Sequence, residues 1–223
     1  MIIRSKAPLR LGLAGGGSDV SPYSDIYGGL VLNATINLYA YCTIEETQDD
    51  KITIHAYDSN NYQESFDSCK ALPIDGKAIL VKGVYNRIVK DYDLEPLSFK
   101  ITTYNDAPAG SGLGTSSTMV VTILKAFIEW LGLPLGDYEL ARLAYEIERK
   151  DLGLAGGKQD RSASACCGFD AVGFLKNDVV VVHRFMAKWW VHDELEAARS
   201  LCLSRRWCRG SAIMEEQMNT TYA

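Results

Sequence analysis

The stretch Pro108-Ala-Gly-Ser-Gly-Leu-Gly-Thr-Ser-Ser-Thr118 decides the fold of this chain, because it joins a glycine-rich loop directly to the apolar run 119–131. Three glycines at alternate positions leave backbone N–H groups without side-chain cover, and four hydroxyl residues follow where a helix begins. The amides and the positive end of the helix dipole favour an anion, and the hydroxyls can bind phosphate oxygen or a metal ion. The stretch therefore predicts a phosphate-binding loop at a helix N-terminus.

Two common glycine motifs do not match the chain. A Walker A loop requires a lysine inside the glycine loop, and none lies between residues 108 and 118. The later pair Gly157-Lys158 is followed by Gln159, and Leu152 stands where the first glycine of that motif belongs. A dinucleotide fingerprint needs glycine at position 115, which is threonine. A plain connecting loop is the structural alternative.

The composition is that of a globular chain: 223 residues, of which 47% are hydrophobic and 23% charged. This length can bury a sizeable core in one large or two small domains. The formal net charge of -5 argues against a nucleic-acid-binding surface, which needs a basic stripe. We therefore expect no nucleic-acid partner, and we expect phosphorylated ligands to be bound by local groups.

Membrane and redox signals are both weak. No apolar run approaches the ~20 residues of a membrane span, and Arg4, Lys6 and Arg10 interrupt the N-terminus. We therefore expect a cytoplasmic protein without a membrane partner. The six cysteines form no disulfide framework, and we interpret them as reduced thiols. Cysteines and histidines near the C-terminus match no zinc-ligand spacing.

The N-terminal part alternates as a sheet does. Residues 1–13 read as a strand that ends at Ala14-Gly-Gly-Gly-Ser-Asp19, a second glycine loop that presents Asp19 as a ligand or a turn residue. Apolar residues occupy the even positions from 30 to 44, which predicts a long half-buried strand. Residues 51–57 alternate in the same way after a turn at Asp49-Asp50, so we expect an antiparallel sheet.

Helical spacing follows in three segments: residues 79–92, residues 119–131, and a run that begins at Asp137, the expected cap. A strand over 97–104 precedes the glycine loop, which gives the strand, loop and helix order of a phosphate site. Glu148 lies at the edge of the third helix's buried face, as either a solvated rim residue or a ligand facing a cavity.

A further flexible loop, Gly153-Leu-Ala-Gly-Gly-Lys-Gln-Asp160, ends in an acid. Two glycine loops and the acid pair Glu148 and Asp160 suggest one cleft. Residues 174–182 read as a hairpin with its turn at 176–178. Exposed apolar strand surface in this hairpin would promote self-association.

Three motifs resemble those of the GHMP kinases, the superfamily of galactokinase, homoserine kinase, mevalonate kinase and phosphomevalonate kinase. They are the segment 6–19, the loop 108–117 and the segment 148–160, in the family's order within residues 1–185. The Gly-Gly-Gly-Ser-Asp and Gly-Gly-Lys-Gln-Asp versions are most similar to those of the bacterial D-glycero-D-manno-heptose 7-phosphate kinases.

The resemblance implies an α+β fold: a GHMP-kinase N-terminal domain over residues 1–185, similar to domain 2 of ribosomal protein S5, with a mixed and mostly antiparallel sheet. Residues 186–223 would be the incomplete beginning of a ferredoxin-like C-terminal domain, because the chain lacks the family's third glycine-rich motif. Surface left by the missing part could support self-association, and the oligomeric state stays open.

The implied activity is transfer of the γ-phosphoryl group of ATP, with Mg2+, to a sugar hydroxyl. The acceptor implied is the anomeric hydroxyl of D-glycero-D-manno-heptose 7-phosphate. The alternatives are a fucokinase- or galactokinase-type enzyme and a nucleotide-binding relative without turnover.

The resemblance also implies residue roles. Asp160 matches the aspartate that takes the acceptor proton, and Arg10 matches the basic residue that keeps it ionised. Ser116 and Glu148 match the magnesium ligands. The residues matching the ATP phosphate loop are Pro108, Ala109, Gly110, Ser111, Gly112, Leu113, Gly114, Thr115, Ser116 and Ser117. Those expected at the sugar are Gly16, Gly17, Ser18, Asp19 and Gly157.

Overall fold

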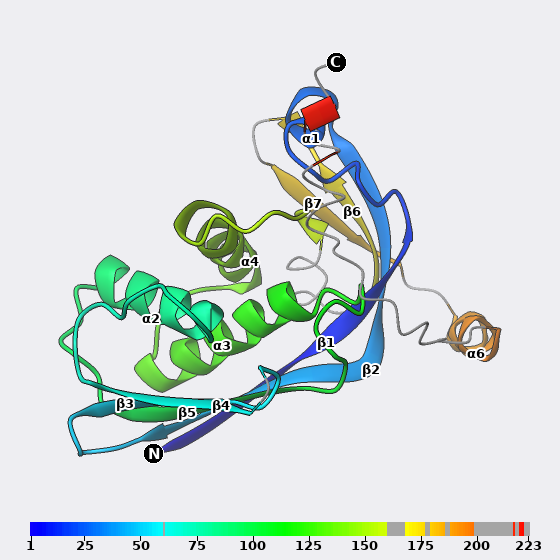
Figure 1. The fold of residues 1–223 in the computed structure, drawn as a ribbon. Coiled ribbons are helices and arrows are strands. Elements are labelled where there is room, and N and C mark those ends of the chain that lie inside the picture. Colours follow the sequence, from blue (N-terminus) through cyan, green and yellow to red (C-terminus); the bar gives the residue numbers. More distant parts are fainter. Residues whose placement is uncertain are drawn as a thin grey trace.

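The long strand β2 (Gly29–Glu46) is the centre of the fold, because β1, β5 and β6 all pair with it. The structure is a computed structural model, described here over residues 1–59, 61–159, 168–176, 179–185, 188–198, 216 and 219–220. The strands of these residues form one seven-stranded sheet in the order β4-β3-β5-β2-β6-β7, with β1 on β2. Helices α2, α3 and α4 lie on one face of this sheet (Figure 1).

The remaining elements complete the chain order. They are β1 (Ile2–Ala14), α1 (Tyr23–Tyr27), β3 (Lys51–Ala56), β4 (Tyr62–Asp67), α2 (Ile79–Asp91), β5 (Phe99–Asn105), α3 (Thr115–Leu131), α4 (Asp137–Glu146), the π-helical turn η1 (Ile147–Asp151), β6 (Phe169–Phe174), β7 (Val180–Arg184) and α6 (Trp189–Ala197).

The mixed, mostly antiparallel α+β architecture that the sequence predicts is confirmed, with one parallel pair, β3–β5. The two strands on either side of the turn at Asp49-Asp50, β2 and β3, do not pair directly, because β5 lies between them. Ser98, just before β5, lies between the end of β2 and the start of β3. Its hydroxyl is 2.9 Å from the Thr47 hydroxyl and accepts the Lys51 N–H at 3.2 Å. Strand β4, which the sequence analysis did not predict, closes this edge against β3.

The buried face of β2 changes along the strand. At its far end Ala40, Cys42 and Ile44 are buried, as the even-position pattern predicts. Near its start the odd positions Val31 and Asn33 are buried instead, and Leu30 is 62% exposed. The β1–β2 register shifts between Pro8 and Arg10, and such a bulge adds twist and redirects side chains. The simple alternation therefore holds for only half of the strand.

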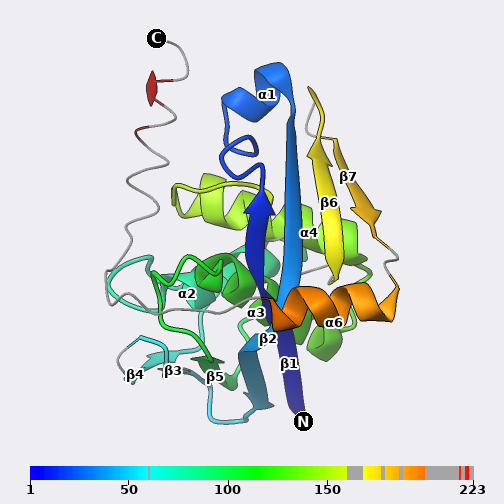
Figure 2. The same ribbon diagram turned by 90° about the vertical axis from the view of Figure 1, so that its right-hand side faces the viewer.

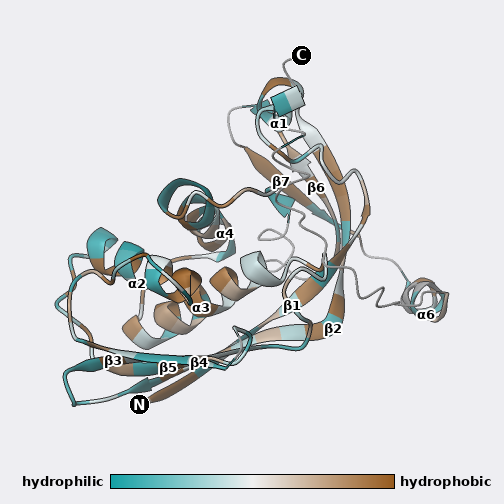
Figure 3. Ribbon diagram, in the orientation of Figure 1, coloured by the Kyte–Doolittle hydropathy of each residue, from teal (hydrophilic) through white to brown (hydrophobic). Residues whose placement is uncertain are grey.

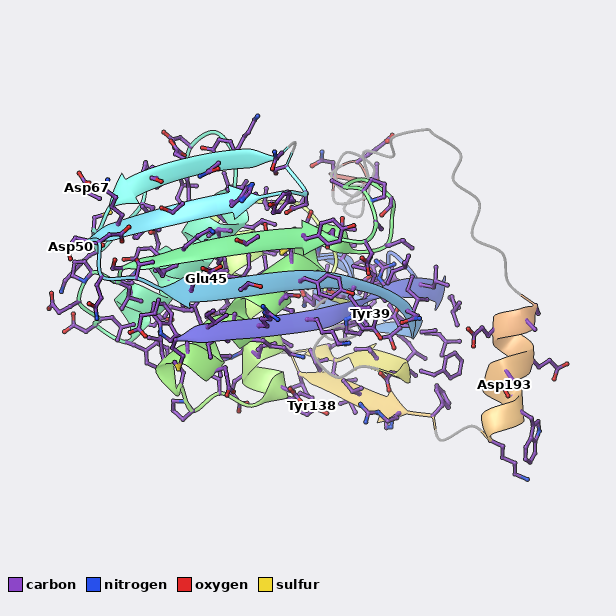
Figure 4. All side chains as sticks on the ribbon, turned by 90° about the horizontal axis from the view of Figure 1, so that it is seen from below. Tyr39, Glu45, Asp50, Asp67, Tyr138 and Asp193 are labelled. Atoms are coloured by element: carbon purple, nitrogen blue, oxygen red, sulfur yellow. The ribbon has the colours of Figure 1, made fainter. Side chains whose placement is uncertain are left out.

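The main core lies between the sheet and the helices. Tyr85 of α2, Phe99 of β5 and Phe127 of α3 are fully buried, and the rings of Phe99 and Phe127 pack edge to face with their centroids 5.5 Å apart. The apolar character of α3 is visible in Figure 3. Viewed from below, strands β1 to β5 show the opposite face, which no helix of the described residues covers, with Tyr39 and Glu45 of β2 on it (Figure 4).

Several predicted boundaries hold, and one capping residue is wrong. Helix α3 ends at Gly132, whose left-handed φ of 63° suits glycine. The N-cap of α4 is Gly136 rather than Asp137, which instead lies in the first turn, where its charge complements the helix dipole. The β6–β7 hairpin is confirmed, with Leu175 N–H donating to the Val179 carbonyl at 2.8 Å (Figure 2). Turn residues 177 and 178 lie outside the described residues.

Predictions about cysteines, membrane spans and the C-terminal segment can be compared with the structure only in part. Cys42 and Cys69 are free thiols, and burial raises the pKa of Cys42. The cysteines at 166, 167, 202 and 208 lie outside the described residues. Within the described part, no helix is long and apolar enough to cross a membrane, and no metal-binding group of His, Cys, Asp and Glu occurs. Most of the expected C-terminal segment 186–223 is also outside the described residues.

We predict that Phe127→Ala lowers the free energy of unfolding by about 3–5 kcal/mol, because it opens a cavity among buried rings. Chemical denaturation followed by circular dichroism measures the change. Glu129→Ala, at an exposed position of the same helix, is the control and should shift the value by less than about 0.5 kcal/mol. Equal effects of the two substitutions would contradict this description of the core.

Candidate active site

The predicted phosphate-binding loop, residues 108–114, has the geometry that its glycines suggest. Gly110, Gly112 and Gly114 have φ values of 78°, 75° and 73°, a left-handed conformation that other residues rarely adopt. Leu113 is buried beside Leu9 and anchors the loop to the sheet. The loop leads straight into α3, whose first amides have no carbonyl partner within the helix. Backbone N–H groups that point into one concave loop form an anion-binding nest, so we call residues 108–114 the nest loop. This loop and the N-terminus of α3 are suited to bind an anion.

Arg10 of β1 connects the sheet to this loop. Its backbone N–H donates to the Leu113 carbonyl at 3.4 Å, and its Nη1 donates to the Gly112 carbonyl at 3.3 Å. The guanidinium is largely buried, and it places a positive charge directly against the nest. Arg10, which the sequence analysis placed near the transferred phosphoryl group, therefore lies at the predicted phosphate site.

Glu148 is a buried carboxylate that contacts the first turn of α3. It belongs to η1, is 1% exposed, and accepts a hydrogen bond from the Ser117 hydroxyl at 2.8 Å. Arg149 Nη2 lies 4.0 Å from the same carboxylate oxygen. Single π-helical turns often occur at functional sites. Of the two alternatives for Glu148, burial rules out the solvated rim position, and its role as a ligand stays a prediction.

The metal site inferred for Ser116 and Glu148 can be compared with these contacts. A carboxylate and neighbouring hydroxyls are the hard oxygen donors that magnesium prefers, so this donor set fits the ion. Ser117 contacts Glu148 directly, whereas Ser116 is exposed in the first turn of α3. The Ser117–Glu148 contact was not anticipated, because adjacent hydroxyls of a motif do not reveal which one faces a distant carboxylate.

Asp19 joins the first glycine loop to the loop 153–159. Its carboxylate is fully buried and accepts the Gly17 N–H at 3.2 Å and the Gln159 N–H at 3.0 Å. The Asp19 carbonyl also accepts the Lys158 N–H at 3.3 Å. A Cβ atom at Gly157 would lie 2.0 Å from Asp19 Oδ2, so only glycine permits this approach. Asp19 thus holds together two segments that lie far apart in the sequence.

Lys158 forms a second link that the sequence analysis missed. Its ammonium group lies 2.8 Å from Asp25 of α1 and is almost fully buried. Partial burial raises the pKa of Asp25, but hydrogen bonds from Lys158 and Ser21 outweigh this effect and leave the pKa below its usual value. The ion pair therefore fixes the loop 153–159 to α1 as well as to Asp19.

The other predicted sugar residues lie in the first glycine loop. The Ser18 hydroxyl donates to the Gly15 carbonyl at 2.7 Å and accepts the Leu30 N–H at 3.2 Å, so it fastens this loop to β2. A Cβ atom at Gly16 would be 3.9 Å from the Gln159 side chain. Asp160 lies outside the described residues, next to Gln159 in sequence. The structure thus brings together Arg10, Asp19, Glu148 and both glycine loops, while the roles assigned to them stay predictions.

Comparison with known proteins identifies this combination of segments. Residues 79–168 match the sequence family described as GHMP kinases N terminal domain. The chain contains a GHMP kinase N-terminal domain. It is 54% identical over 195 residues to the D-glycero-alpha-D-manno-heptose 7-phosphate kinase of Campylobacter jejuni, covering 87% of this chain. A galactokinase of Thermosipho africanus is 30% identical over 78% of this chain.

A solved structure extends the likeness of the GHMP kinase domain. It is described as a D-glycero-D-manno-heptose 1-phosphate kinase from Bacteroides thetaiotaomicron, with 72% identity, a TM-score of 0.86 and coverage of 88% of this chain. The chain spans 57% of the Campylobacter relative, 46% of the Thermosipho one and 64% of the solved chain.

We predict that Gly157→Ala breaks the Asp19–Gln159 hydrogen bond in the GHMP kinase domain, because the new methyl group would overlap the Asp19 carboxylate. Hydrogen exchange followed by mass spectrometry should show about tenfold faster exchange of the Gln159 amide. Gly16→Ala is the control, because its Cβ meets no atom closer than 3.9 Å. Unchanged protection in Gly157→Ala would show that Asp19 does not hold this loop.

Proposed function

We propose that this protein is an ATP-dependent sugar-phosphate kinase that transfers the γ-phosphoryl group of ATP to a sugar hydroxyl. The observation that carries the proposal is the buried Ser117–Glu148 pair at the N-terminus of α3, beside a three-glycine nest that Arg10 contacts. Anion-binding amides, a fixed positive charge and a buried carboxylate are the groups that phosphoryl transfer needs, because its catalysis consists mainly of positioning and charge stabilisation.

The nest loop would bind the phosphates of ATP through backbone amides. Its left-handed glycines expose these amides, and the dipole of α3 adds a positive potential. Arg10 would neutralise part of the negative charge that the phosphates bring. Its hydrogen bond to the Gly112 carbonyl holds the guanidinium at the loop before any ligand binds, so little reorganisation is required.

Ser116 and Glu148 would hold a magnesium ion, and Ser117 would orient Glu148. The ion, when bound, would neutralise charge on the phosphate oxygens. The 2.8 Å bond from the Ser117 hydroxyl fixes one carboxylate oxygen, and such supporting contacts set the orientation of metal ligands. The burial of Glu148 keeps water from competing for its charge.

In the transfer step, Asp160 would accept the proton of the acceptor hydroxyl. The oxygen of that hydroxyl would form a bond to the γ-phosphorus, and the bond from this phosphorus to the bridging oxygen of ADP would break. Arg10 would favour the ionised form of Asp160, since a nearby positive charge lowers the pKa of a carboxyl group. The hydrogen bonds of Asp19 and Lys158 hold Gln159, the residue before Asp160, in place.

The acceptor we propose is the anomeric hydroxyl of D-glycero-D-manno-heptose 7-phosphate, with Asp19 and the first glycine loop at the sugar. The name of the Campylobacter relative, 54% identical, supports this sugar. Because ATP and sugar phosphates are cytoplasmic metabolites, we place the reaction in the cytoplasm. A galactokinase- or fucokinase-type acceptor is the alternative that the test below separates.

We predict that Ser117→Ala raises the Mg2+ concentration for half-maximal activity about tenfold, because Glu148 loses the contact that orients it. Ser117→Thr, which keeps the hydroxyl, should restore the wild-type requirement. Ser116→Ala, which would remove a direct ligand, should have a larger effect. A normal Mg2+ requirement in Ser117→Ala would exclude the positioning role, and a normal one in Ser116→Ala would exclude Ser116 as a ligand.

The function itself is tested by calorimetry with ATP and Mg2+, followed by an ADP-release assay with heptose 7-phosphate, galactose and fucose. We expect ATP binding and release of ADP with the heptose phosphate. Release of ADP with another sugar would replace the acceptor, and binding without turnover would identify a non-catalytic relative.

We predict that Asp160→Asn lowers turnover by about 10^3-fold while ATP still binds, because the variant cannot accept the proton of the acceptor hydroxyl. Asp67→Asn, on the distant edge strand β4, is the control and should leave turnover unchanged.

A further inference from the structure

Three polar groups converge on the exposed glycine of β1. Gly12 has no side chain, and a Cβ atom placed on it would lie 3.3 Å from Arg10 Nη1, 3.4 Å from Gln159 Oε1 and 3.8 Å from Asn33 Oδ1. Gly12 itself is exposed, whereas the three side chains around it are buried. The side of Gly12 on which a side chain would lie is therefore surrounded by three buried polar side chains, and we call this place the polar recess.

Two of these groups lack hydrogen-bond partners. Asn33 is 1% exposed, and neither its Nδ2 nor its Oδ1 has a hydrogen-bond partner. Gln159 Oε1 also lacks a partner. A buried polar group without a partner is unfavourable, and native structures contain few of them. The Gln159 orientation is set from the other side, where its Nε2 approaches Asp19 Oδ1 at 3.5 Å, so its carbonyl oxygen is left facing the recess.

Asp170 of β6 continues a row of polar residues that runs across the sheet from Gly12 through Asn33. Gly12 of β1 pairs with Asn33 of β2, and Asn33 pairs with Asp170 of β6. Asp170 is 1% exposed, and both of its oxygens lack hydrogen bonds, although Arg184 Nε lies 3.5 Å away. Burial raises the pKa of Asp170, and the charge of Arg184 opposes this shift. Oxygen acceptors thus outnumber donors along the row.

We infer that Gly12, Asn33 and Gln159 form a subsite that binds a hydroxyl group of the polyhydroxylated acceptor. The inference rests on the proposed function and adds residues to it. A hydroxyl can donate to the Gln159 or Asn33 oxygen and at the same time accept from Arg10 or the Asn33 amide, so it matches the mixed recess. A fully ionised phosphate only accepts, and it would face the side-chain carbonyl oxygens of Gln159 and Asn33. The subsite therefore receives the hydroxyl-bearing part of the acceptor and not its phosphate.

Two other interpretations of the recess are weaker. A metal cation would find oxygen ligands there, but the Arg10 guanidinium, 3.3 Å from the Gly12 position, would repel it. A purely structural role would require Asn33 to bond a neighbour, and it bonds none among the described residues. Both interpretations give distinct results in the experiment.

The test compares wild-type chain, Asn33→Leu and Gly12→Ala by calorimetry with D-glycero-D-manno-heptose 7-phosphate and, separately, with ATP and Mg2+. Each variant should bind the heptose phosphate about tenfold more weakly, the loss of roughly one hydrogen bond, and Asn33→Leu, which does not crowd Arg10, should leave ATP affinity unchanged. Asn33→Leu should also raise the melting temperature by about 2–4 °C, because it removes an unpartnered buried amide. Asn37→Leu, exposed on the same strand, is the control that should change neither affinity.

Deoxy analogues of the heptose phosphate identify the hydroxyl concerned. One analogue should bind wild type about tenfold more weakly than the parent sugar, and Asn33→Leu should bind it as wild type does. Wild-type affinity for the parent sugar in both variants would overturn the subsite while leaving the proposed function in place. A lower melting temperature with unchanged sugar affinity would give Asn33 a structural role, and weaker binding of ATP with Mg2+ in Asn33→Leu with unchanged sugar affinity would indicate a metal site; either overturns the inference. No sugar binding by wild type would overturn the proposed function as well.

Discussion

The hydrogen bond between the Ser117 hydroxyl and the Glu148 carboxylate is the interaction on which the site depends. It joins the first turn of α3 to η1 at 2.8 Å, with both side chains buried. A buried carboxylate is unfavourable unless it is hydrogen-bonded, so this contact fixes where the charge of Glu148 lies. The Glu148 carbonyl in turn accepts the Leu154 N–H at 2.8 Å, which starts the loop 153–159 from the same point. The nest loop and the loop before Asp160 therefore share one support.

A second support comes from the other end of the loop 153–159, where Asp19 accepts the Gln159 amide. Because Gly157 leaves room for the Asp19 carboxylate, the backbone of this loop packs directly onto the first glycine loop. Arg10 completes the arrangement, since it bonds the nest loop from the strand that leads into the first glycine loop. Three segments distant in sequence are thus held together by hydrogen bonds to buried charged groups, which favours a preorganised site.

Much of this arrangement could be predicted, because its signals are local. The nest glycines, the helix behind them and the long strand each follow from short stretches of sequence, and the structure confirms them. The position of β5 between β2 and β3 could not be predicted, since turn residues at Asp49-Asp50 do not reveal a strand that arrives later in the chain. The Ser117–Glu148 contact could not be predicted from the sequence either. It depends on the rotation of α3 and on the π-helical turn at Glu148, and neither has a signature in the motif.

The register shift between β1 and β2, where Leu9 alone stands opposite residues 36–38 of β2, explains how a sheet core and a polar recess can share one pair of strands. Leu9 and Arg10 are consecutive and both buried, which regular alternation does not allow, and the register with β2 shifts at this point. Beyond the shift the buried face of β2 falls on odd positions, so Asn33 occupies a place that would otherwise suit an apolar residue. The alternation that predicts the buried residues Ala40, Cys42 and Ile44 at the far end of β2 fails at this position. Such local conflicts are expected where a protein keeps groups for a ligand at the expense of stability. The shift that brings Arg10 to the nest loop is therefore also the one that turns Asn33 toward the recess at Gly12.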